Sequence, residues 1–123
     1  MWNQPTKKQL AKIPNLYSNE NDTVSLRDVK IHMHLFIGGT DWYVAEYDEK
    51  EDLLWGFCVL NNDLQNAEWG YASLDELKGI RVRGVDVDRD LHWEIRKASE
   101  VEQIAKAQGW KCPPRRGLAP PFT

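Results

Sequence analysis

The sequence has no long hydrophobic run. No apolar stretch approaches the roughly 18 residues needed to cross a bilayer, and the N-terminal MWNQPTKKQLAKIP lacks the apolar stretch of a signal peptide. Cysteine is scarce as well: there are 2 in 123 residues, and no CxxC spacing occurs. A disulfide framework is therefore not expected. These absences predict a cytoplasmic protein that does not bind a membrane.

Recognisable catalytic motifs are missing too. The chain contains no GxSxG, no glycine-rich phosphate loop and no Cys–His arrangement with local support. Cys58 lies within the apolar segment 53–60, where an inert core thiol is expected. The sequence therefore leans against an enzyme without deciding the question.

Positive charge is in short supply over most of the chain. Residues 1–108 hold all 19 acidic residues but only 13 of the 16 basic ones, a net charge of −6. Such a body disfavours sequence-independent binding to a nucleic-acid backbone. The other three basic residues lie in 109–123, a Pro-rich tail that we expect to be flexible. Only this tail has the charge to contact nucleic acid or an acidic partner.

The chain does contain a regular succession of strand and helix patterns. Alternating or continuous apolar residues predict strands at 29–37, 41–47, 53–60, 67–73 and within 80–88. Capping-box patterns that begin at Thr6, Ser73 and Ser99 each predict a short helix. We expect one α+β domain over residues 1–108. It would have a mainly antiparallel meander sheet of about five strands, with two or three short helices packed mostly on one face.

The chain is rich in tryptophan, with 6 residues. Tryptophan buries a large area but often keeps its N–H near a polar partner or an edge. The content therefore fits either a small domain that fills its core with large side chains or an aromatic binding face. Trp42 lies on a predicted strand and is a candidate for such a face, which would bind a peptide or stack the bases of a single-stranded nucleic acid.

The segment VDVDRDLHWEI, residues 85–95, places polar side chains at every second position. In a straight strand Asp86, Asp88, Asp90 and His92 would share one face, about 6.5 Å apart. Carboxylates with one imidazole suit Mg²⁺, Mn²⁺ or Zn²⁺. The minority hypothesis is thus a divalent metal on these four residues.

The favoured alternative for this segment is a solvated strand end that runs into a turn, with no cofactor. Asp88 or Asp90 would accept backbone N–H groups there, and Arg89 would pair with a neighbouring carboxylate. An EF-hand loop is excluded because Leu91 stands where its glycine is needed, and Lys97 where its bidentate glutamate is needed.

Two further features leave alternatives open. The clean alternation of 29–37 predicts that His32 and His34 share a face, either as a mixed polar and aromatic surface or as two ligands of one metal. His92 is the only other histidine. The acidic cluster within residues 46–52 is expected to be a solvated hairpin tip that blunts edge pairing. The alternative is a docking patch for a basic partner.

Several motifs resemble a known family. They are KKQLAKIPNLY (7–17), DWYVAEYD (41–48), LLWGFCVLNND (53–63), AEWGYASLDEL (67–77) and VDRDLHW (87–93). Together they are similar to domain-of-unknown-function family 2958, small bacterial proteins often encoded on plasmids, integrative elements and phages. The resemblance spans roughly residues 5–105, and DRDLHW is its most specific part. It implies an accessory protein of mobile DNA and carries over no catalytic residue.

These observations predict a non-enzymatic protein- or peptide-interaction module. The candidate binding residues are His32, His34, Trp42, Arg89, Asp90 and His92. One alternative is a metal-dependent hydrolase or nuclease that uses the Asp86, Asp88, Asp90 and His92 cluster. A further alternative is single-stranded nucleic-acid binding on an aromatic sheet face.

Overall fold

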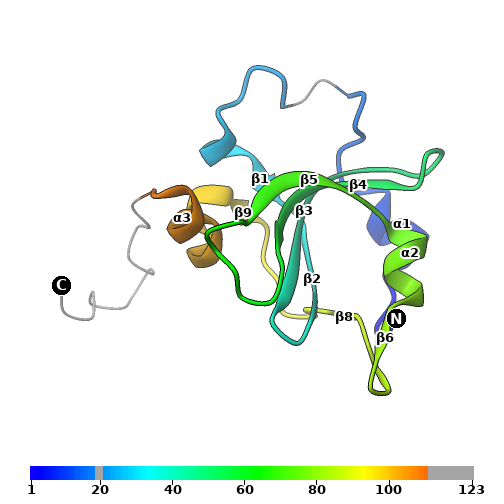
Figure 1. The fold of residues 1–123 in the computed structure, drawn as a ribbon. Helices are drawn as coiled ribbons and strands as arrows, with labels where there is room; N and C mark the ends of the chain where they lie inside the picture. Colours follow the sequence, from blue (N-terminus) through cyan, green and yellow to red (C-terminus); the bar gives the residue numbers. More distant parts are fainter. Residues whose placement is uncertain (19–20, 111–123) are drawn as a thin grey trace.

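The computed structural model describes residues 1–18 and 21–110 and centres on one antiparallel sheet. Its five strands lie in the order β5-β4-β3-β2-β8 (Figure 1). Their bounds are Met33–Ile37 for β2, Thr40–Asp48 for β3, Leu53–Val59 for β4, Glu68–Ser73 for β5 and Asp88–Arg89 for β8. Because β2 to β5 are successive neighbours, the sheet is a meander. The predicted α+β fold with about five mainly antiparallel strands is confirmed.

Two short ladders flank this sheet. They pair β1 (Lys30–Ile31) with β9 (Arg96–Lys97), and β6 (Arg81–Val82) with β7 (Val85–Asp86). The single strand predicted within 80–88 is therefore wrong, because the segment turns back at Arg83 and Gly84. Both residues have positive φ, 53° and 80°, as a two-residue type I′ hairpin turn requires.

Three short α-helices complete the domain, together with two 3₁₀ turns. The helices are α1 (Lys7–Leu10), α2 (Leu74–Gly79) and α3 (Glu102–Gln108), and the turns are η1 (Leu26–Asp28) and η2 (Ala98–Glu100). The capping box at Thr6 forms as predicted, and at Ser73 the hydroxyl caps the helix by accepting the N–H of Glu76. The cap predicted at Ser99 is wrong, because this residue is buried within η2 and α3 begins only at Glu102. No helix in the described ranges is long and apolar enough to cross a membrane.

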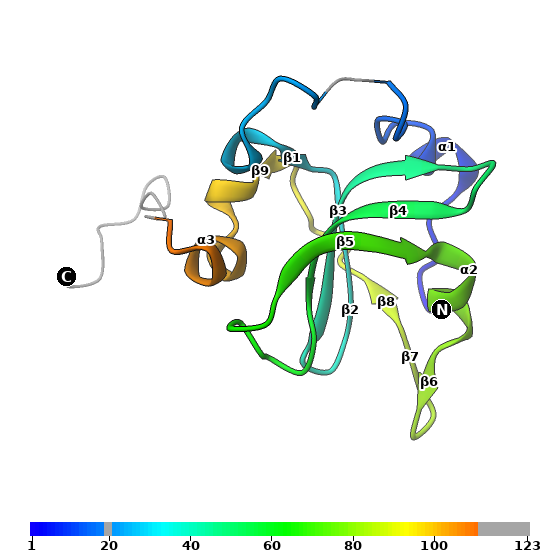
Figure 2. The same cartoon turned by 45° about the horizontal axis from the view of Figure 1, so that its top comes forward.

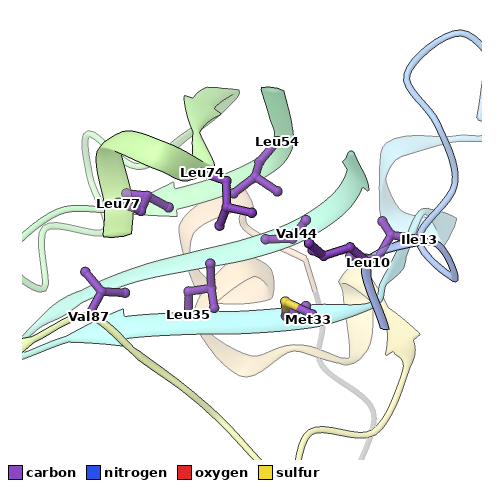
Figure 3. Packing of buried hydrophobic residues seen from close by; sticks show 9 residues of the cluster. All are labelled: Leu10, Ile13, Met33, Leu35, Val44, Leu54, Leu74, Leu77 and Val87. Carbon is purple, nitrogen blue, oxygen red and sulfur yellow. The ribbon is translucent and has the colours of Figure 1, made fainter. Parts of the chain in front are cut away.

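The helices divide the buried residues into two clusters on opposite faces of the sheet. The α1/α2 face holds Leu10, Ile13, Met33, Leu35, Val44, Leu54, Leu74, Leu77 and Val87 (Figure 3). The α3 face holds Val29, Ile31, Tyr43, Ala45, Phe57, Val59, Ala98, Val101 and Ile104. α3 lies beside the β1–β9 ladder, away from α1 and α2 (Figure 2). Two of the three α-helices thus share one face, as expected.

Two irregularities change which side chains face each cluster. The β3–β4 register shifts between Val44 and Glu46, so that Ala45 is the extra residue of a β-bulge. A break at His32 separates β1 from β2, and as a result Ile31 packs on the α3 face while Met33 packs on the α1/α2 face.

Most of the predicted tail, residues 109–123, lies outside the described residues. Its first residue, Gly109, ends α3 with a left-handed φ of 72°, a conformation that favours glycine.

Candidate functional site

His34 lies on β2 with a carboxylate beside each ring nitrogen. Its Nε2 is 2.7 Å from Oδ1 of Asp41, near the start of β3, and its Nδ1 is 3.4 Å from Oδ2 of Asp90, just after β8. Ionised carboxylates only accept, so both contacts are hydrogen bonds when each nitrogen carries a proton. The side chains of His34 and Asp41 are 14% and 13% exposed, against 33% for Asp90. The Asp41 pair is therefore better shielded from water.

Aromatic rings enclose this imidazole. It stacks on Tyr43 with ring centroids 4.6 Å apart and planes 9° apart, and the rings of Phe36 and Trp93 lie at 5.4 Å. The Tyr43 hydroxyl donates to Oε1 of Gln103 on α3. Burial raises the pKa of the Tyr43 phenol, and the charge of Asp41 raises it further. The phenol therefore stays protonated as a donor at neutral pH.

The same imidazole ends a row of rings that crosses the sheet. Trp69 pairs with Phe57, Phe57 with Tyr43, and Tyr43 with His34, one residue from each of β5, β4, β3 and β2. Directly opposite side chains in an antiparallel sheet share a face and touch. Nε1 of Trp69 donates to Oε1 of Gln108 at 3.3 Å, which ties the far end of the row to α3.

Asp90 joins this row to the loop that follows β8. We call residues 90–96 the anchored loop. The Asp90 N–H donates to the carbonyl of His34 at 3.0 Å. Its Oδ1 accepts the N–H of His92 at 3.0 Å, and its carbonyl accepts the N–H of Trp93 at 3.3 Å. Asp90 thus closes a tight turn and holds this turn against β2.

Trp93 fixes the second half of the anchored loop. Its Nε1 donates to the carbonyl of Ile31 at 3.0 Å, and its ring lies 5.8 Å from that of Tyr43. The guanidinium carbon of Arg96 lies 4.2 Å from the centroid of the Trp93 ring, within range of a cation–π contact. The anchored loop is therefore held against β2 at Asp90 and against β1 at Trp93.

The anchored loop presents apolar side chains to solvent. Leu91 is 56% exposed and Ile95 is 57% exposed, and His92 and Glu94 between them are exposed as well. The backbone is thus held by polar and aromatic contacts on one side, while large aliphatic groups face outward on the other.

Comparison with known proteins gives one assignment. Residues 5–110 match the family described as protein of unknown function, DUF2958. The chain belongs to this family. No curated protein and no solved structure gives a significant match. Any role for this DUF2958 member must therefore be argued from its own geometry.

Trp42, a predicted binding residue of this DUF2958 member, lies away from His34. Its side chain packs against the α1/α2 cluster, because neighbouring residues of β3 face opposite sides. There it borders a shallow pocket of about 190 Å³ that is also lined by Gly56, Cys58 and Gly70. Burial raises the pKa of the Cys58 thiol, which fits the inert cysteine expected from the sequence.

His32 does not share a face with His34, contrary to the prediction. The strand break at His32 leaves it among α1/α2-face residues, where it lines a cavity of about 640 Å³ together with Leu10, Ile13 and Tyr47. The two imidazoles therefore do not face a common ligand.

Arg89 and His92 lie close to the anchored loop but in separate roles. Nε of Arg89 donates to the carbonyl of Asn3 at 2.9 Å, which ties the N-terminal segment to β8. His92 contributes its backbone N–H to the Asp90 turn and exposes its side chain.

The three carboxylates among the candidate metal ligands have different partners, and Asp90 meets His34. Asp86 pairs with Nε of Arg81 at 3.1 Å, and Oδ1 of Asp88 accepts Nδ2 of Asn3 at 2.8 Å. Within residues 1–18 and 21–110, no group of three or more His, Cys, Asp or Glu side chains is placed to hold a metal ion. The geometry therefore gives the metal hypothesis no support.

Sequence reasoning missed several members of the site: Asp41, Tyr43, Trp93, Arg96, Leu91 and Ile95. The first two had a usable signal. A two-residue turn at Gly38 and Gly39 sets the β2–β3 register, which places Tyr43 opposite His34 and Asp41 on the diagonal. The contacts of Trp93 depend on a tertiary return of the chain and had no local signal.

Proposed function

We propose that this domain is a non-enzymatic protein-binding module and that the anchored loop is its contact surface. The observation that carries the proposal is the exposure of Leu91 and Ile95 on a backbone fastened through Asp90 and Trp93. Apolar groups at the centre of a patch with polar neighbours are typical of protein interfaces. A loop that is already ordered loses little conformational entropy on binding.

The arrangement around His34 supports a structural role for the imidazole. Carboxylates occupy both ring nitrogens, and Tyr43 covers one ring face. A general base needs a nitrogen within reach of the proton that it abstracts. Here both nitrogens are already directed at Asp41 and Asp90, so the cluster is better suited to holding the anchored loop than to catalysis.

The central aromatic row also argues against base stacking at this position. Tyr43 is buried, and Gln103 and Gln108 of α3 bond to the row. Bases stack on exposed ring faces. Single-stranded nucleic-acid binding on this part of the sheet is therefore the weaker alternative.

A role as an accessory protein of mobile DNA and a cytoplasmic location belong to the same proposal. Both come from the sequence, and both stay predictions. The protein partner predicted from the sequence would bind the anchored loop, and no cofactor is needed for this function.

A capture experiment with a matched control tests the proposal. Tagged wild-type protein would be used to enrich a partner from the source bacterium, and binding would be remeasured with purified components. The double variant Leu91→Ser, Ile95→Ser should weaken binding at least about tenfold. Each substitution removes an aliphatic side chain that the partner would bury, and each such contact contributes about 1–2 kcal/mol. Leu60→Ser is the control, because Leu60 is also 57% exposed but lies after β4. Unchanged affinity of the double variant would contradict the proposal.

A further inference from the structure

A second group of aromatic side chains lies on the α3 face, away from the anchored loop. Tyr71 on β5 pairs directly with Trp55 on β4, and Trp55 pairs with Glu46 on β3. Because directly paired residues share a face, the two rings and the carboxylate form one row. The Trp55 ring stacks on Trp69 with centroids 5.1 Å apart. Tyr71 is 67% exposed, the most exposed large hydrophobic residue in the described ranges.

Tyr17 adds a third ring and a second carboxylate to this surface. It is 64% exposed, and its hydroxyl donates to Oε2 of Glu51 at 2.6 Å. The hydrogen bond to Glu51 raises the pKa of Tyr17. Asp48 lies two residues after Glu46 on β3 and therefore faces the same side of the sheet. Its Oδ1 accepts Nδ2 of Asn15 at 2.8 Å, and Oδ1 of Asn15 accepts the N–H of Tyr17 at 2.9 Å, which places Tyr17 on the side of the sheet that carries Glu46. We call Tyr17, Glu46, Glu51, Trp55 and Tyr71 the aromatic–acidic patch.

Acidic residues give the aromatic–acidic patch a negative charge. Residues 46–52 contain five acidic residues and one basic residue, Lys50. Glu46 accepts a hydrogen bond from Nδ2 of Asn21 at 2.7 Å, and Glu51 accepts one from Tyr17. An ionised carboxylate has about four acceptor sites, so Glu51 can accept a hydrogen bond from a further donor. Exposed rings between such carboxylates favour a cation.

We propose that the aromatic–acidic patch binds an extended, arginine-bearing segment of a partner protein. A guanidinium stacks on an aromatic face and donates two parallel hydrogen bonds to a carboxylate, which an ammonium does not do. Tyr71 offers an exposed ring face and Glu51 an exposed carboxylate, and Glu46 and Trp55 extend the same face beside them. The charge complementarity of these groups selects a basic segment over an acidic or apolar one. This proposal does not rest on the anchored loop.

Fluorescence anisotropy with a labelled peptide tests it on the full-length protein. The probe is GPRRPRRPG, and GPQQPQQPG is the uncharged control. Wild-type protein should bind the arginine peptide, more weakly as NaCl rises from 50 to 200 mM, because charge attraction is screened. Tyr71→Ala should weaken binding about 3- to 5-fold, the size of an exposed cation–π contact. Glu51→Gln should weaken it by a similar factor, and Tyr71→Phe should retain it.

Each outcome decides the question. The proposal is overturned if wild-type protein fails to bind the arginine peptide, binds the glutamine peptide equally well, or loses nothing on Tyr71→Ala. Tyr71 and Glu51 are exposed, and an unchanged melting temperature of the variants shows that any loss is local. The Leu91→Ser, Ile95→Ser variant should bind the arginine peptide like wild type. Failure here and failure of the anchored-loop proposal are thereby distinguished.

Discussion

The two carboxylates beside His34 should contribute unequally to stability. Nε2 lies 2.7 Å from Asp41 in a pair that is 14% and 13% exposed, whereas Nδ1 lies 3.4 Å from Asp90, which is 33% exposed. A shielded, charge-assisted hydrogen bond contributes about 1.5–3 kcal/mol. A longer pair open to water contributes about 0.2–1 kcal/mol. The His34–Asp41 coupling energy should therefore exceed the His34–Asp90 coupling energy by about 0.5 kcal/mol or more.

Two double-mutant cycles measure these couplings. Asp41→Asn and Asp90→Asn would each be made alone and together with His34→Phe, which retains a ring for stacking on Tyr43 and removes both nitrogens. Unfolding in urea at pH 7 would be followed by tryptophan fluorescence. Trp93 contributes to this signal, and its emission is sensitive to the site because its ring lies 5.4 Å from the imidazole of His34. The difference between single and double variants isolates each pairwise energy.

Two results would contradict the roles given to Asp41 and Asp90 as partners of His34. A His34–Asp90 coupling equal to or larger than the His34–Asp41 coupling would mean that exposure and distance do not rank these contacts. Two couplings near zero would mean that the imidazole acts through stacking alone. In that case Trp93, with its bond to the carbonyl of Ile31, would be the principal fastening of the anchored loop.

Two further predictions concern β3 and its neighbour β4. Gly56→Ala should destabilise the domain by at least about 2 kcal/mol in urea unfolding, because a Cβ there would lie 1.9 Å from the carbonyl oxygen of Tyr43. Gly70→Ala is the control: its added Cβ meets nothing within 4 Å, so it should cost less than about 1 kcal/mol. Equal effects of the two substitutions would contradict this reasoning. Burial raises the pKa of Tyr43, so the unfolded chain loses this proton first above about pH 10 and stability should fall there. Tyr43→Phe should flatten that fall in unfolding free energy between pH 9 and 11, and an unchanged slope would count against the buried phenol as its cause.

The sequence predicted those parts of the fold that depend on neighbouring residues. The apolar patterns of β2 to β5 and the caps at Thr6 and Ser73 are local, and these strands and caps form where they are expected. The errors in strand faces occur where one extra residue interrupts the alternation. The bulge at Ala45 and the break at His32 have no local signature, yet each turns the side chains that follow to the other face.

The candidate site was also predicted only in part. The sequence predicts both His34 and Asp90 as binding residues, and the structure brings their side chains together. It also predicts Trp42 because of its aromatic ring, but strand alternation places this residue on the opposite face. The exposed pair Leu91 and Ile95 could not be predicted, because a straight strand through 85–93 would have placed Leu91 on the face opposite the aspartates.

The alternating aspartates of residues 85–95 show why spacing alone did not identify a ligand set. β7 ends at Asp86 and β8 spans only Asp88–Arg89, so no unbroken strand carries all three carboxylates. Asp86 meets Arg81, Asp88 meets Asn3, and Asp90 meets His34. Each carboxylate therefore has a different donor, which offsets the mutual repulsion expected along a straight strand. These partners come from three parts of the chain, so the segment links the β6–β7 hairpin, the N-terminal residues and β2. Period-two spacing predicts a shared face only over the length of an unbroken strand, and here no strand exceeds two residues.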